Sequence, residues 1–120
     1  MTTVLVVDDV KTDRELIGKV VTDAGHLVLY ATDGEEALAQ ARACHPGLIL
    51  LDVIMPRMDG FGACRRLKAD AETSAIPVVM VTHKSAPSDR FWGKKQGADH
   101  YLTKPFTPSQ LQEVLRLYAR

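Results

Sequence analysis

The stretch from Leu48 to Pro56 constrains the fold more than any other part of this chain. Residues 48–51 are four aliphatic residues in succession, a pattern typical of a strand that is buried on both faces. Asp52 follows directly, and Pro56 cannot continue a central strand. The stretch therefore predicts a buried strand that presents one carboxylate at its carboxyl end, the edge at which open parallel sheets bind ligands.

Four further apolar runs alternate with helical patterns along the chain. Strands are expected at residues 4–7, 27–31, 76–81 and 100–103, in addition to 48–51. Helices are expected to begin near Thr12, where Thr12 and Glu15 fit a capping box, and near Asp33, Gly60, Pro87 and Thr107. Five alternations of this kind predict an α/β fold, a parallel sheet covered by helices on both faces, in a single domain spanning residues 1–120.

Charge and composition narrow the classes of protein. The chain has 120 residues with 15 basic and 15 acidic side chains, so no net charge favours nucleic acid or an anionic membrane. No apolar run is long enough to span a membrane, and no signal peptide precedes the first expected strand, which indicates a cytoplasmic protein. Cys44 and Cys64 lack metal-binding spacing and are expected to be buried or half-buried in a reducing compartment.

Polar residues follow four of the five expected strands. They are Asp8 and Asp9, Asp52, Thr82 and Lys104, and the carboxyl ends of parallel strands meet at one edge of the sheet. Carboxylates that share a cleft repel one another, and Mg²⁺ with oxygen ligands is a natural neutraliser. A metal, a lysine and a hydroxyl around one carboxylate are suited to phosphoryl transfer with Asp52 as the nucleophile.

Five motifs extend this pattern over essentially the whole chain: residues 6–9, 31–38, 51–60, 81–82 and 97–106. Together they resemble the receiver domain of two-component response regulators, the CheY-like type. That resemblance implies a flavodoxin-like sheet with the strand order 2-1-3-4-5 known for CheY. Residues 91–98 further resemble stand-alone regulators of type IV pilus twitching motility, of the PilH and PilG type.

The resemblance also implies the roles of the acidic residues. Asp52 would accept a phosphoryl group from the phosphohistidine of a histidine kinase. Asp9 and Asp52 would ligate Mg²⁺ directly, Asp8 would act mostly through water, and the backbone carbonyl of Ile54 would supply a further ligand.

Four other residues receive roles from the same resemblance. Lys104 would bind a phosphoryl oxygen, as would Thr82, and the Lys104–Pro105 peptide bond would be cis. Thr82 and Tyr101 would form a switch pair. A downstream protein would recognise the face formed by the helix at 87–96, the strand at 100–103 and the last helix.

Three residues depart from the usual family pattern. His83 follows Thr82 where a small residue is usual, Ile54 is apolar, and Lys84 carries a positive charge. We expect these residues to alter the rates of phosphoryl transfer or hydrolysis, in a direction that the sequence does not give, while the chemistry stays the same.

Three other classes of protein fit the sequence less well than a signalling module does. A small Mg²⁺-dependent phosphatase with an aspartyl nucleophile, of the haloacid dehalogenase type, is the main alternative, but it usually carries a second Asp where this chain has Ile54. A flavodoxin-like cofactor-binding protein would need a phosphate-cradling loop where Asp8 and Asp9 would repel phosphate. A DNA-binding protein would need a basic face or a helix-turn-helix. The sequence favours a signalling module rather than an enzyme.

Overall fold

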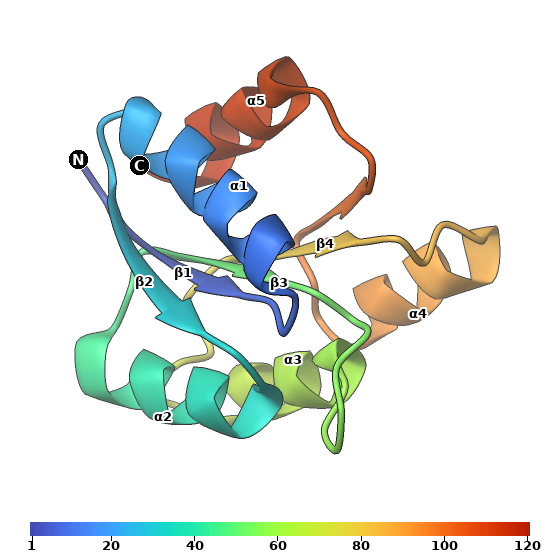
Figure 1. The fold of residues 1–120 in the computed structure, drawn as a ribbon. Coiled ribbons are helices and arrows are strands. Elements are labelled where there is room, and N and C mark those ends of the chain that lie inside the picture. The colour runs from blue at the N-terminus through green and yellow to red at the C-terminus, as the bar shows by residue number, and fades with distance from the viewer.

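Strands and helices alternate along the whole chain in the computed structural model, which describes all 120 residues (Figure 1). The strands are β1 (Thr3–Val7), β2 (Leu27–Ala31), β3 (Leu48–Leu51), β4 (Val78–Thr82) and β5 (His100–Thr103). The helices are α1 (Lys11–Asp23), α2 (Gly34–Cys44), α3 (Gly60–Ala69), α4 (Pro87–Lys95) and α5 (Pro108–Tyr118). All strands are parallel in the order β2-β1-β3-β4-β5, which confirms the predicted architecture.

The sheet separates two hydrophobic cores. Leu48 and Leu50 of β3 face the core that α1 and α5 cover, whereas Ile49 and Leu51 face the core that α2 and α3 cover. Figure 1 shows these two pairs of helices on opposite sides of the sheet. Successive side chains of a strand point to opposite faces, so the unbroken aliphatic run of β3 follows from its place between two cores.

The register of the strands places the polar strand ends side by side. Val7 of β1 is the register partner of Leu51 of β3, so Asp8 and Asp52 leave the sheet next to each other. At the other side, Thr82 of β4 pairs with Thr103 of β5, and Lys104 follows. The Lys104 N–H donates to the Thr82 carbonyl at 2.8 Å. The expected convergence of these residues is therefore built by the sheet itself.

The structure corrects two local predictions. The capping box at Thr12 is wrong, because α1 begins at Lys11 after Val10, and no side chain of the N-cap residue accepts a hydrogen bond. The Asp8 carboxylate instead accepts the Val10 N–H at 2.9 Å. The expectation for the cysteines holds for Cys64, which is buried, but is wrong for Cys44, which is exposed at the end of α2.

None of the helices combines the length and the apolar character that crossing a membrane requires.

Candidate functional site

Three carboxylates meet at the carboxyl ends of β1 and β3. Asp8 is fully buried, Asp52 is 5% exposed and Asp9 is exposed. Each offers an oxygen, and these oxygens lie within 4.8 Å of one another. Asp52 is held locally, because its Oδ1 accepts the N–H of Ile54 at 3.1 Å. The predicted acidic cluster is therefore present as a group of side chains.

Lys104 connects this cluster to the far side of the sheet. Its Nζ donates to Asp8 Oδ2 at 2.6 Å and to Asp52 Oδ2 at 3.1 Å. The Lys104 side chain is only 5% exposed, and the peptide bond to Pro105 is cis. An ammonium group thus lies against the carboxylate that is expected to react.

Burial and nearby charges shift the pKa values of Asp8 and Lys104 in opposite directions. Burial raises the pKa of Asp8, while hydrogen bonds from Lys104 and the Val10 N–H oppose the rise. Burial alone would lower the pKa of Lys104, but its hydrogen bonds to Asp8 and Asp13 and the nearby negative charges raise it above its usual value. Lys104 is therefore charged at neutral pH, and a proton remains easier to place on Asp8 than on an ordinary aspartate.

The donor set fits a hard dication such as Mg²⁺. Carboxylate oxygens are the ligands that Mg²⁺ prefers in proteins, and it commonly uses one or two of them together with water. The three carboxylates of Asp8, Asp9 and Asp52 share a single positive charge from Lys104. A dication would offset the remaining negative charge.

Thr82 and Tyr101 lie on either side of one backbone segment. Thr82 is fully buried, and its Oγ1 accepts a long contact of 3.4 Å from the N–H of Lys84. The Tyr101 hydroxyl donates to the Lys84 carbonyl at 2.7 Å. Burial raises the pKa of Tyr101 to about 12. The two residues of the predicted switch pair are therefore both hydrogen-bonded to the backbone of Lys84.

Sequence reasoning missed one residue of this site. Asp13, in the first turn of α1, accepts a hydrogen bond from Lys104 Nζ at 2.9 Å across 91 residues of sequence. Asp13 lies between Thr12 and Glu15, the two residues whose spacing predicts a capping box. No local pattern distinguishes this carboxylate from an ordinary residue of a helix N-terminus, so the sequence carries no signal that places it beside Lys104.

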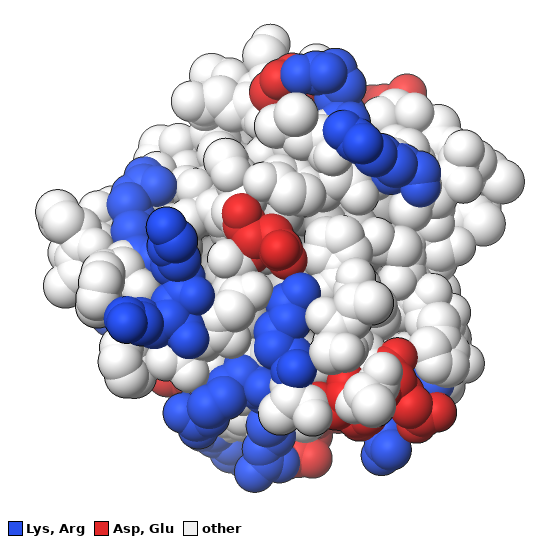
Figure 2. All heavy atoms as spheres, turned by 180° about the vertical axis from the view of Figure 1, so that it is seen from behind, with Lys and Arg blue, Asp and Glu red and all other residues white.

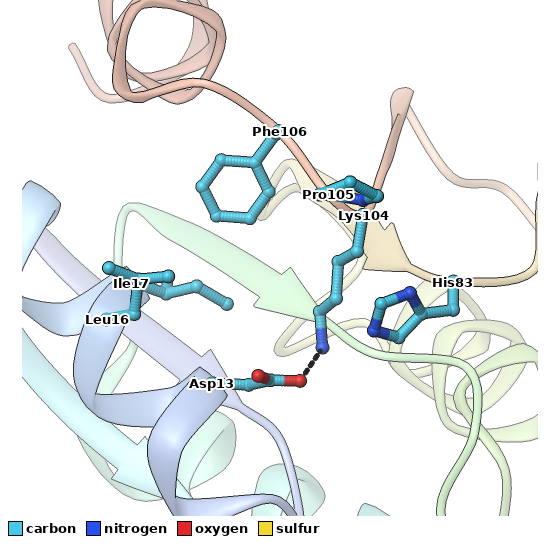
Figure 3. A pocket seen from close by; sticks show the side chains of 7 residues that line it. All are labelled: Asp13, Leu16, Ile17, His83, Lys104, Pro105 and Phe106. Atoms are coloured by element: carbon cyan, nitrogen blue, oxygen red, sulfur yellow. Dashed lines mark hydrogen bonds and ion pairs between the residues drawn. The ribbon is translucent and has the colours of Figure 1, made fainter.

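A small pocket opens beside Lys104. In Figure 3, Asp13 and Lys104 point toward each other from α1 and the segment after β5, and the His83 ring lies on the other side of the lysine. The residues that line the pocket are Asp13, Leu16, Ile17, His83, Lys104, Pro105 and Phe106. His83, one of the three departures from the family pattern, thus lies in the wall of this pocket together with Lys104.

The family model of the response regulator receiver domain matches residues 4–116 of the chain. PilH of Pseudomonas aeruginosa is 44% identical over 115 residues, which make up 96% of this chain and 95% of PilH. The chain is also 38% identical over 117 residues, 98% of its length, to the probable transcriptional regulator ycf27 of Porphyridium aerugineum. It spans about half of that longer protein, 48% of its length.

Solved structures show the same fold. The chemotaxis protein CheY4 of Vibrio cholerae superposes with a TM-score of 0.92 at 36% identity, with 98% of both chains covered. The receiver domain of the sensor histidine kinase PA1611 of Pseudomonas aeruginosa gives a TM-score of 0.90 at 27% identity, with 98% of this chain and 96% of that chain covered. The latter was determined with a magnesium ion coordinated in its active site cleft.

Proposed function

Since this chain belongs to the response regulator receiver family, we propose that it accepts a phosphoryl group on Asp52 from a histidine kinase. Receiver domains are signalling modules rather than classical enzymes. In the proposed step, a carboxylate oxygen of Asp52 forms a P–O bond while the P–N bond of the kinase phosphohistidine breaks. The product is an aspartyl phosphate on this chain and a free histidine on the kinase.

One observation carries this proposal: the buried carboxylate of Asp52 lies 3.1 Å from the ammonium of Lys104 at the edge where three carboxylates meet. Preorganised positive charge at the place where negative charge gathers is the main source of catalysis in phosphoryl transfer. The Lys104 side chain is held there by burial and by its ion pairs, so its positive charge is already in place when the phosphoryl group arrives.

We propose Mg²⁺ as the cofactor, held by Asp9 and Asp52 with Asp8 acting mostly through water and the Ile54 carbonyl as a further ligand. The ion would neutralise charge on the phosphoryl oxygens. The oxygen-only donor set supports this proposal, as does the magnesium in the related receiver domain of PA1611.

Phosphorylation tests the proposal directly. Acetyl phosphate with Mg²⁺ should add one phosphoryl group to the native chain, and intact-mass measurement should show the adduct. Asp52→Asn should abolish it, and Asp9→Asn should reduce it strongly because the metal ligand is lost. Asp23→Asn, on the exposed last turn of α1, is the matched control and should behave like the native chain.

The outcome distinguishes the main alternative as well. Repeated turnover of phosphate esters without a stable adduct would indicate the aspartyl-nucleophile phosphatase, and an equal adduct on Asp52→Asn would contradict the assignment of the acceptor. The side chain of Ile54 is exposed and cannot transfer protons, so the position at which such phosphatases usually place an acid–base residue carries none here.

The signal is proposed to leave through the face formed by α4, β5 and α5, with Thr82 and Tyr101 as the switch pair. The aromatic residues Phe91 and Trp92 are exposed on α4. Basic side chains of that helix lie beside them, and Figure 2 shows basic clusters on this side of the molecule. Aromatic side chains are enriched at protein interfaces. The 44% sequence identity to PilH over nearly the full length of both chains supports the proposal that this chain acts in a pathway that controls type IV pilus twitching motility.

A further inference from the structure

The ammonium of Lys104 has no free hydrogen. It carries three N–H groups, and three carboxylates accept from it: Asp8 at 2.6 Å, Asp13 at 2.9 Å and Asp52 at 3.1 Å. The side chain is 5% exposed, so solvent offers no alternative partner. A phosphoryl oxygen can gain a hydrogen bond from Lys104 only if one of these carboxylates gives up its own.

The three carboxylates differ in whether a metal ion could also bind them. Asp8 and Asp52 belong to the group of oxygens that could hold a metal ion, whereas Asp13 does not. A dication would therefore draw charge from Asp8 and Asp52 and weaken their hold on Lys104. The contact with Asp13 has no such competitor and should persist when the metal site is filled.

We propose that Asp13 is a positioning residue that competes with the phosphoryl group for Lys104. This inference rests on the proposed function and adds to it a fourth carboxylate. The Asp13 side chain is 31% exposed, at the rim of the pocket in Figure 3. It keeps the ammonium at the site in the resting protein, and its negative charge opposes the accumulation of further negative charge when an anion binds.

Removal of the Asp13 charge should have opposite effects on the binding of Mg²⁺ and on the binding of a phosphoryl-like anion. Removing the Asp13 charge takes away a negative charge that attracts Mg²⁺, so Mg²⁺ should bind more weakly. The same change replaces the carboxylate that accepts from Lys104 with a neutral and weaker acceptor, and it lowers the repulsion, so an anion should bind more tightly once Mg²⁺ is saturating. If Asp13 had a purely structural role, its replacement would lower the affinity for Mg²⁺ and for the anion together.

The test uses Asp13→Asn, which keeps the size of the side chain. Mg²⁺ alone is titrated by calorimetry, and beryllofluoride, a phosphoryl mimic, is titrated at saturating Mg²⁺ and followed by its own ¹⁹F NMR signal. We expect Mg²⁺ affinity to fall and beryllofluoride affinity to rise, each by about fivefold, the size of a partly exposed ion pair. Asp13→Glu, which restores the charge, should bring both affinities back toward native values.

Glu15→Gln is the matched control. It removes the same charge from the same helix, but Glu15 is 64% exposed and pairs only with Lys11 at 3.9 Å. It should leave both affinities close to native. Native affinities in Asp13→Asn, or losses of both ligands in a folded variant, would overturn the role of Asp13. Failure of the native chain to bind beryllofluoride or to become phosphorylated would instead overturn the proposed function.

Discussion

At the scale of single residues, burial changes the protonation and the accessibility of the ionisable side chains. Asp8 and Lys104 are ionisable side chains buried beside each other, and each lowers the cost of burying the other. The two cysteines also differ in burial. Cys64 is buried in the core beneath α3, and its Sγ donates to the Gln96 carbonyl at 3.5 Å, whereas Cys44 is exposed.

The first prediction concerns these thiols. Burial raises the pKa of Cys64 from the usual thiol value of 9.0 to about 11, and only the thiolate is nucleophilic. At pH 8 an aromatic disulfide reagent should therefore modify one thiol of the native chain, none of Cys44→Ser, and both thiols of the native sequence in denaturant. Rapid modification of two thiols in the folded protein would contradict the buried position of Cys64.

The same shift has a consequence for stability. A thiol whose folded pKa lies above its unfolded value stabilises the fold fully below the unfolded pKa and loses that contribution as pH rises through the folded pKa. The denaturant concentration at the midpoint of unfolding should therefore decrease as the pH is raised from about 9 to about 11. The decrease should be smaller in Cys64→Ala.

At the scale of elements, the start of α3 is fitted tightly against the end of β3. The Gly60 N–H donates to the Val53 carbonyl at 2.9 Å, and the Asp59 carboxylate caps the helix by accepting the Gly62 N–H at 2.9 Å. A Cβ on Gly60 would lie 2.1 Å from the carbonyl oxygen of Asp52. The helix can approach the acceptor residue this closely only because Gly60 has no side chain.

We predict that Gly60→Ala destabilises the protein by about 1–3 kcal/mol, because backbone must move to relieve the overlap. Urea unfolding measures the change. Gly62→Ala is the matched control in the same helix, since its Cβ would meet no atom closer than 3.4 Å. That variant should be unchanged or up to about 1 kcal/mol more stable. Equal stability of the two variants would show that the close approach of α3 carries no energetic weight.

The elements themselves could be predicted because their patterns are local. An aliphatic run such as residues 48–51 has one common solution, a doubly buried strand, and parallel strands bring their carboxyl ends together. Asp8, Asp9, Asp52, Thr82 and Lys104 could therefore be placed at one edge from sequence. Asp13 could not, because a first-turn carboxylate beside Thr12 matches a helix cap equally well, and only the fold brings Lys104 to it.

At the scale of the whole molecule, the site and the proposed partner face are joined through the β4–α4 connection. Lys84 accepts the Tyr101 hydroxyl with its carbonyl and donates its N–H to Thr82 Oγ1. Tyr101 lies against α4, where a Cβ on Gly93 would come within 3.1 Å of its ring. The ring also lies under the guanidinium of Arg90, 5.3 Å from its centroid. A displacement of Thr82 can thus reach α4 through three contacts, from Thr82 to Lys84, from Lys84 to Tyr101 and from Tyr101 to α4.

The last prediction tests this coupling. The 3.4 Å contact between Lys84 and Thr82 is long, so a phosphoryl oxygen that attracts the Thr82 hydroxyl breaks little when Thr82 moves. The Lys84 segment should then shift with it, and the hydrogen bond that fixes Tyr101 should weaken, which lets the ring change position against α4. Beryllofluoride with Mg²⁺ should therefore change the amide chemical shifts of Lys84, Tyr101 and Trp92.

Two variants separate the steps of this path. Thr82→Ala should still bind beryllofluoride but lose most of the shift changes at Tyr101 and Trp92, because the hydroxyl that moves is gone. Tyr101→Phe keeps Thr82 but removes the hydrogen bond to the Lys84 carbonyl, so Lys84 should respond as in the native chain while Trp92 responds less. A full response at Trp92 in Thr82→Ala would mean that the signal reaches α4 by another route, since no hydroxyl would remain at position 82 to couple the bound anion to the Lys84 segment.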